Sequence, residues 1–174
     1  MKIVVTDIRP SEARQAQLVF NATWRVTYPN KKARITLADI RHRQQGSLGK
    51  ARIQKRREMI KNLPRNEKYL VAKVGNKVIG VCIAIKHKDK NVLSAIYVLP
   101  KYQGKGVGGL LWNAVKNFLN PKKDTVVHVA TYNLNAIRFY KKLGFRVSRR
   151  RFLEERLRMK SGSIIPQTEM VRKA

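Results

Sequence analysis

Four glycines stand close together between an apolar run and a helical pattern: Gly104, Gly106, Gly108 and Gly109. The run before them is rich in β-branched residues and ends at Pro100, and apolar residues recur at helical spacing after them through Phe118. A glycine-rich turn that opens a helix exposes backbone N–H groups at the positive end of the helix dipole. The chemistry that suits this stretch is therefore the binding of an anion such as a phosphate.

Two common phosphate-binding patterns do not fit the surroundings of this turn. Residues 104–109 satisfy Gly-x-Gly-x-x-Gly, but no acidic residue follows at the end of a second strand, because Asp124 precedes its strand. The Walker pattern is absent too, since the turn has no Gly-Lys-Ser/Thr. A phosphate site of another kind is indicated.

Two motifs, one at Gln103-x-x-Gly106-x-Gly108 and one from Asn133 to Phe145, resemble those of the GCN5-related N-acetyltransferases, the GNAT family. Gln103-x-x-Gly106-x-Gly108, preceded by Tyr-Val-Leu-Pro-Lys-Tyr, resembles the family's acetyl-CoA-binding motif. Asn133 to Phe145 resembles its other signature, Asn-x-x-Ala-x-x-Phe-Tyr-x-x-x-Gly-Phe, and the spacing between the motifs leaves room for one helix and one strand. The resemblance extends from about Lys2 to Val147.

The resemblance implies that acetyl-CoA is the co-substrate. The strand before the turn would pair its backbone with the pantetheine arm, the turn would hold the pyrophosphate, and Lys105 would add positive charge. The cofactor-binding residues would be Ile96, Tyr97, Val98, Gln103, Gly104, Lys105, Gly106, Val107, Gly108, Gly109, Asn133 and Tyr140. Asn133 has a competing role, shared with Asn135, as the cap of the helix that follows.

Acetyl transfer to an amine needs a neutral amine, a donor to the developing oxyanion and a proton for the departing thiolate. By resemblance, Tyr140 is the candidate general acid, and the alternative is a buried tyrosine that only packs. The Val98 N–H is the candidate oxyanion donor. Many relatives carry a glutamate base on the strand before the turn, but Val92–Leu99 has no carboxylate. Ser94 or Tyr97 could pass a proton through water, or the amine could arrive neutral.

The acceptor site is expected on the first two helices and their loop. Trp24, Thr27 and Tyr28 would supply aromatic and hydroxyl walls for an amine. For Trp24, packing in the core is the competing interpretation.

The pattern of elements predicts an α/β fold with a mixed, mostly antiparallel central sheet flanked by helices, as in GNAT proteins. A splayed pair of strands would hold acetyl-CoA, and residues 1–174 would form a single GNAT domain. Strands are expected at 2–8, 69–74, 77–86, 92–99, 125–131, 145–153 and 169–172, with Gly75-Asn76 as a hairpin turn. Helices are expected from Ser11 as N-cap to about Val26, from a Thr36–Asp39 capping box, and over 51–63, 110–118 and 136–143.

The charge of the chain is unusual, with 39 lysines and arginines against 10 acids and a net charge of +29. The bases are dispersed, and residues 101–150 alone hold 11 of them against one acid, Asp124. Three interpretations stay open. They are a protein associated with nucleic acid or ribosomes, a natural enzyme with an uncommon imbalance, and a deliberately supercharged enzyme whose active-site motifs are intact.

The remaining composition predicts a cytoplasmic protein without a metal. No apolar run is long enough to cross a bilayer, the start of the chain is not a signal peptide, and the three histidines lack metal-ligand spacing. The single cysteine, Cys82, lies in an apolar strand and is expected to be buried and unreactive.

Two hypotheses about function follow. The first is an acetyl-CoA-dependent N-acetyltransferase that acts by direct attack of a primary amine: a small amine, a polyamine or a protein amino group. The alternative is a non-catalytic GNAT-like module whose basic surface binds nucleic acid or another polyanion without sequence preference. Since GNAT relatives often form dimers, the resemblance also leaves a homodimer open.

Overall fold

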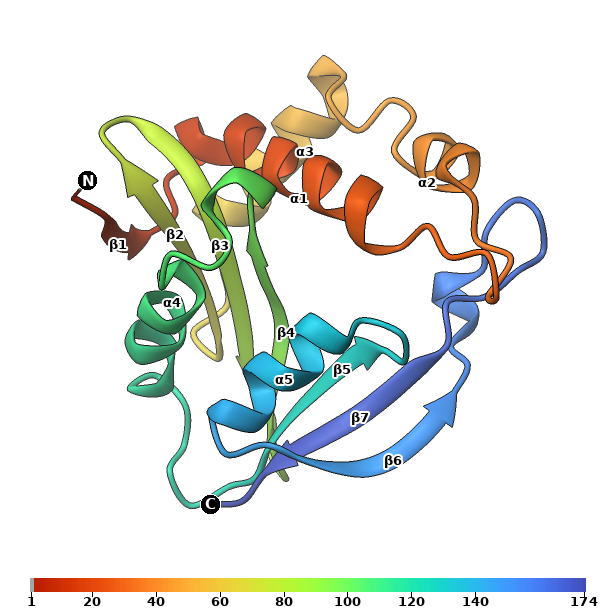
Figure 1. Cartoon of the computed structure of the whole chain (residues 1–174). Coiled ribbons are helices and arrows are strands. Elements are labelled where there is room, and N and C mark those ends of the chain that lie inside the picture. The colour runs from red at the N-terminus through yellow and green to blue at the C-terminus, as the bar shows by residue number, and fades with distance from the viewer. Residues whose placement is uncertain (1) are drawn as a thin grey trace.

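A seven-stranded sheet with helices on both faces forms the body of the protein in the computed structural model, which describes residues 2–174 (Figure 1). The strand order is β1-β2-β3-β4-β5-β7-β6, and every neighbouring pair is antiparallel except β4 with β5. The predicted fold class is confirmed. The strands are β1 (Val4–Asp7), β2 (Glu67–Val74), β3 (Lys77–Lys86), β4 (Asn91–Val98), β5 (Thr125–Ala130), β6 (Arg146–Phe152) and β7 (Gln167–Arg172). The α-helices are α1 (Ala13–Thr27), α2 (Leu37–Arg43), α3 (Lys50–Lys61), α4 (Val107–Lys116) and α5 (Leu134–Lys142).

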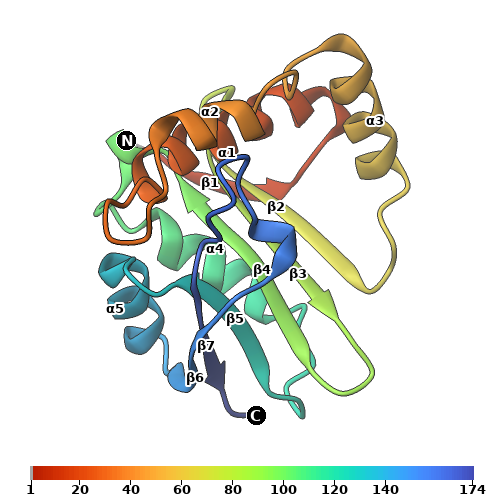
Figure 2. The same ribbon diagram turned by 90° about the vertical axis from the view of Figure 1, so that its right-hand side faces the viewer.

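The centre of the sheet is buried on both faces. On β2, Leu70 and Ala72 join the core under α4 and α5, whereas Tyr69 and Val71 join the core under α1 and α3. This alternation follows from the two-residue period of a strand. It explains why residues 69–72 of β2 and 78–85 of β3 are continuously apolar, and Figure 2 shows the helices on opposite sides of the sheet. None of the helices within residues 2–174 has the length and apolarity that a bilayer-spanning helix needs.

Local signals fixed most of the element boundaries. Gly75, at φ +55°, makes the predicted hairpin turn between β2 and β3. Thr36 caps α2, and the Asp39 carboxylate accepts a hydrogen bond from the Thr36 backbone N–H at 2.9 Å, which confirms the capping box.

The start of α1 differs from the prediction. Residues Pro10–Glu12 form a 3-10 turn, and Ser11 does not cap the helix. The Glu12 carboxylate accepts a hydrogen bond from the Arg9 backbone N–H at 2.8 Å and pairs with Lys73 at 2.8 Å. Glu12, the N-cap residue of α1, therefore holds the turn before the helix locally and ties it to β2 through an ion pair.

Strands β4 and β5 lie together only where they begin. Their parallel register consists of Asn91 opposite Thr125 and Val92 opposite Val126. Beyond these pairs the two strands separate, as Figure 1 shows, and β5 continues to pair with β7 on its other side. The predicted splayed pair is present.

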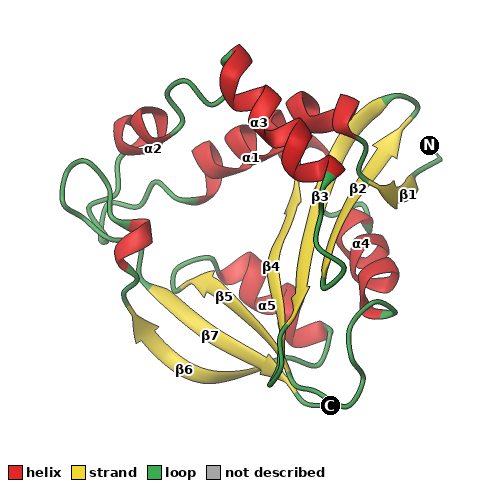
Figure 3. Cartoon of the chain, turned by 180° about the vertical axis from the view of Figure 1, so that it is seen from behind, coloured by secondary structure: helices red, strands yellow, loops and turns green. Residues whose placement is uncertain are grey.

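The segment between β6 and β7 returns to the helices across the sheet (Figure 3). The Ser161 backbone N–H donates to the Asp39 carboxylate at 3.3 Å, and the Arg43 guanidinium donates to the Arg156 carbonyl at 2.6 Å. Leu157, Met159 and Ile165 of this segment are buried with residues of α2 and of the loop before it. This segment forms a wall on the side of the sheet where α1 and α2 lie.

Candidate active site

A cleft of about 890 Å³ lies where β4 and β5 diverge. Its lining comes from the end of α1, from β4, from the glycine-rich turn, from β5 and from α5. The wall contains every residue predicted for the site except Trp24 and Lys105. The roles of these residues stay predictions.

The cleft-facing edge of β4 offers unpaired backbone groups. Because the Leu99 N–H donates to the Ile79 carbonyl on β3, the pairs Val98–Gly80 and Ile96–Cys82 are the non-hydrogen-bonded positions of this antiparallel ladder. The N–H and C=O groups of Ile96 and Val98 therefore point away from β3, toward the space between β4 and β5 where these two strands have separated. The Gln103 side chain donates to one of them, the Val98 carbonyl, at 2.9 Å and so holds the turn against the strand.

The glycine-rich turn has the backbone that its sequence predicts. Gly104 and Gly106 have φ of +72° and +80°, a region that side chains disfavour, and Gly106 is the N-cap of α4 without a side-chain cap. A Cβ atom on Gly108 would lie 3.1 Å from the Phe139 ring, so this glycine lets α4 and α5 approach closely. A Cβ atom on Gly109 would meet nothing within 4 Å. The first N–H groups of α4 face the cleft and suit an anion.

Tyr140 lies on α5 at the back of the cleft and is 5% exposed. Its ring packs edge-on against Phe145, with centroids 5.5 Å apart. Burial raises the pKa of its hydroxyl, which keeps its proton at neutral pH and has no hydrogen-bond partner within residues 2–174. Asn133 caps α5 by accepting from the Ala136 N–H at 3.1 Å, so the capping role is real, and its side chain also lines the cleft.

The side of the cleft next to the end of α1 is lined by tyrosines. The hydroxyls of Tyr28 and Tyr97 lie 2.7 Å apart, and the Tyr132 hydroxyl donates to the Tyr28 carbonyl at 2.7 Å. Burial raises the pKa of Tyr28 and Tyr97 and raises that of Tyr132 to about 12, so all three are neutral at physiological pH. Thr27 lies beside them in the wall.

Two predicted residues lie outside the wall. Trp24 packs edge-on against Tyr28, with centroids 4.5 Å apart, and the Arg43 guanidinium lies 5.5 Å from the centre of the tryptophan ring. Lys105 is exposed, with its ammonium 5.8 Å from the centre of the Tyr102 ring.

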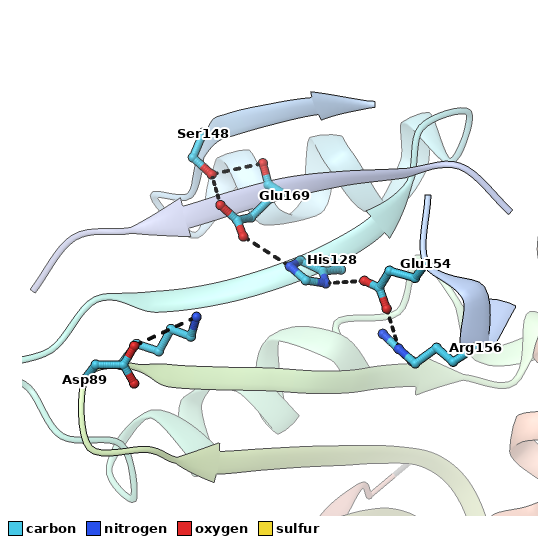
Figure 4. Close-up of polar contacts among 7 residues, drawn as sticks. Asp89, His128, Ser148, Glu154, Arg156 and Glu169 are labelled. Carbon is cyan, nitrogen blue, oxygen red and sulfur yellow. Dashed lines mark hydrogen bonds and ion pairs between the residues drawn. The ribbon is translucent and has the colours of Figure 1, made fainter. Parts of the chain in front are cut away.

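His128, which was not predicted as a site residue, lines the cleft from β5. Its Nδ1 lies 2.8 Å from a Glu154 oxygen and its Nε2 lies 3.2 Å from a Glu169 oxygen (Figure 4). A polar residue within the apolar run Val126–Ala130 was the available signal. Among the described residues that line the cleft, none is an aspartate or glutamate, and no cluster of possible metal ligands was found over residues 2–174.

Comparison with known proteins finds a match to one family model. Residues 65–147 match the model of an acetyltransferase (GNAT) domain, and the matched segment contains β4, the glycine-rich turn, α5 and His128. Over this segment the chain is similar to GNAT acetyltransferase domains. No curated protein sequence matches it significantly.

Solved structures share the fold of this chain. A PaiA N-acetyltransferase from Thermoplasma acidophilum, solved in complex with coenzyme A, superimposes with a TM-score of 0.74 at 18% identity over 100% of both chains. A GNAT-family acetyltransferase from Streptococcus pneumoniae gives 0.67 at 18% identity over 98% of this chain and 99% of its own. The ribosomal-protein-S18-alanine N-acetyltransferase from Escherichia coli gives 0.62 at 16% identity over 98% and 93%.

Proposed function

We propose that this protein is an acetyl-CoA-dependent N-acetyltransferase that transfers the acetyl group to a primary amine by direct attack. One observation carries the proposal: a single cleft joins the open edge of β4, the exposed N–H groups of α4 and the unpartnered Tyr140 hydroxyl. These are an extended binding edge, an anion site and a proton donor. Each of the three has a use in acetyl transfer from acetyl-CoA.

The cleft fits acetyl-CoA. Its volume of about 890 Å³ lies within the range of small-molecule sites. The phosphates would lie at the start of α4, where Gly109 leaves open space. The pantetheine arm would pair with the backbone groups of Ile96 and Val98 in place of the missing strand.

Different residues of the site would then serve different steps of the reaction. The Val98 N–H donates to the acetyl oxygen as it gains negative charge. The Tyr140 hydroxyl, which is protonated at neutral pH, donates its proton to the departing thiolate. The tyrosine-lined side, with Tyr28 and Tyr97, receives the amine. A protein α-amino group belongs among the candidate acceptors, since one structural neighbour is named as an alanine N-acetyltransferase of a ribosomal protein.

The cofactor site is tested by replacing Gly109 with glutamate. A Cβ atom fits there without contact, and the position has an ordinary helical φ, so the added carboxylate should repel the phosphates while the fold is retained. We expect coenzyme A to raise the Tm of the wild-type protein and to leave the Tm of Gly109→Glu unchanged, because a ligand stabilises only the state that binds it. Differential scanning fluorimetry measures both shifts.

Gly109→Ala is the matched control and should respond to coenzyme A as the wild type does, because it adds a small group and no charge. Gly106 and Gly108 are poorer targets, since a side chain would strain the former and press on Phe139 at the latter. An undiminished Tm shift in Gly109→Glu would place the phosphates elsewhere.

The second candidate function is a non-catalytic module that binds polyanions, and the net charge of +29 is the observation that favours it. The two functions separate in one assay. Consumption of acetyl-CoA that depends on an amine, measured over a panel of small amines, polyamines and peptide amino termini, supports the enzyme. Binding of coenzyme A without turnover of any acceptor supports the module.

A further inference from the structure

His128 lies at the point where the cleft begins. It follows Val126, the last residue of β5 that pairs with β4, by two positions along the strand. Its side chain is 32% exposed and lines the same cleft as Val98 and Tyr140. A titratable nitrogen is therefore present in a cleft whose wall holds no carboxylate among the described residues.

Two carboxylates hold the His128 ring, one at each nitrogen. Glu154 lies at Nδ1 at 2.8 Å and is itself bound by Arg156, while Glu169 lies at Nε2 at 3.2 Å and accepts from the Ser148 hydroxyl at 2.7 Å. Figure 4 shows this series of contacts, which runs from Ser148 on β6 through Glu169 on β7 and His128 on β5 to Glu154 in the segment after β6. An imidazolium satisfies both contacts, because it donates from both nitrogens.

The neutral ring can satisfy only one of the two contacts, since it carries one N–H. The shorter contact, to a Glu154 carboxylate that Arg156 also holds, favours the proton on Nδ1. In the neutral ring, the hydrogen bond from Nε2 to Glu169, the longer of the two contacts, is therefore absent, and Nε2 has a lone pair. The Ser148 hydroxyl and His128 lower the pKa of Glu169, so that its carboxylate is ionised and ready to accept once Nε2 is protonated.

We propose that His128 Nε2 takes the proton from an acceptor amine that arrives as an ammonium, and that Glu154 and Glu169 stabilise the imidazolium formed. This inference rests on the proposed acetyl transfer and names its acceptor class, a primary aliphatic amine. A second observation points into the same cleft: the Tyr140 hydroxyl, on a side chain 5% exposed, has no partner within residues 2–174.

The proton and bond changes balance. The ammonium gives one proton to His128, the neutral amine forms the C–N bond to the acetyl carbon, and the C–S bond breaks. Tyr140 protonates the thiolate and regains the second proton from the amide nitrogen. The imidazolium then releases its proton to solvent, so the net products are the amide, coenzyme A and one proton.

The charges around His128 come from several elements. Glu154 and Arg156 follow β6, Glu169 lies on β7, and Lys90 before β4 acts on Glu169. The Phe152 ring packs edge-on against the imidazole, with ring centroids 4.9 Å apart. The Arg149 guanidinium lies 4.8 Å from the centre of the same Phe152 ring. The two carboxylates make this an acidic spot in a cationic protein, which suits an incoming ammonium.

The test compares two acceptors that differ in charge, benzylamine and O-benzylhydroxylamine. The first is an ammonium at neutral pH and needs a base, whereas the nitrogen of the second is already neutral. We expect His128→Gln to lower kcat/KM for benzylamine by roughly 10²-fold, the lower end of general-base effects, and to leave the hydroxylamine rate and the acetyl-CoA KM nearly unchanged. His87→Gln, at an exposed histidine in the turn after β3, is the control and should leave both rates unchanged.

Equal losses with both acceptors, or no loss with either, would overturn the role of His128. A wild-type protein that binds coenzyme A but acetylates neither acceptor would count against the proposed function instead. In that case a second measurement still decides the inference.

Nitrogen-15 NMR of the histidine rings follows the protonation of His128 without any acceptor. With coenzyme A bound and at the pH of the kinetic assay, we expect the single ring proton on Nδ1 and a lone pair on Nε2. A ring that is doubly protonated under these conditions, or one that carries its single proton on Nε2, would overturn the proposal.

Discussion

Tyr140 combines a tightly packed ring with a free hydroxyl. Tyr140→Phe removes the hydroxyl and keeps the contact of the ring with Phe145, so we expect the fold and the affinity for acetyl-CoA to be retained. The loss should fall on kcat, at the low end of the roughly 10²–10⁴-fold range of general acid catalysis, because a thiolate is a good leaving group. Steady-state kinetics with saturating acetyl-CoA measures this loss.

The donor thiol provides the control for this variant. An acetyl thioester of a more acidic thiol needs less help in leaving, so the deficit of Tyr140→Phe should shrink with such a donor. Full turnover of the variant with acetyl-CoA would make Tyr140 a packing residue, with solvent as the source of the proton.

At the scale of elements, α2 is joined through Asp39 to the segment between β6 and β7. The Thr36 hydroxyl and backbone N–H, together with Ser161, lower the pKa of this carboxyl from its ordinary value of 3.8 to about 2. A carboxyl whose pKa is lower in the folded state stabilises that state above its unfolded pKa, and the contribution is lost as the pH falls through the folded value. We expect Asp39→Asn to cost about 1–2 kcal/mol at neutral pH and progressively less from about pH 4 down to pH 2.

Urea unfolding of both proteins across this pH range measures the difference. Asp7→Asn is the control, because Asp7 is exposed and pairs with Lys68 at the surface, where such pairs contribute little. A cost for Asp39→Asn that is the same at pH 2 as at pH 7 would contradict the assignment to the ionised carboxylate.

Elements with local signals were predictable, and contacts between distant segments were not. The hairpin at Gly75, the capping box at Thr36 and the glycine turn at Gly106 each depend on neighbouring residues, and each was found. The partners of His128 are 26 and 41 residues away along the chain, so no spacing rule could connect them to it. The ion pair that ties the start of α1 to β2 likewise joins Glu12 and Lys73, which are 61 residues apart.

At the scale of the whole molecule, the charge should govern association. The 10 acids can neutralise at most 10 of the 39 bases, so a strong positive potential surrounds the fold. We expect the protein to bind two unrelated DNA duplexes of equal length with equal affinity. That affinity should fall at least about tenfold between roughly 50 and 200 mM salt.

Fluorescence anisotropy of labelled duplexes measures this binding. The affinity for coenzyme A, which is itself a polyanion, should fall in the same direction with salt. Binding that prefers one sequence and persists at high salt would contradict a purely electrostatic attraction and would indicate a dedicated nucleic-acid surface.

Because Cys82 is buried, the rate at which a reagent modifies its thiol reports how often the folded protein opens. The thiol lies in the middle of β3 with 0% exposure, and burial raises its pKa, so a thiol reagent can modify it only after the central sheet separates. The chain has one cysteine, so every modified molecule reports the same event. The modification rate under native conditions therefore measures the free energy of that opening, and coenzyme A should slow the rate in wild type and in Gly109→Ala but not in Gly109→Glu.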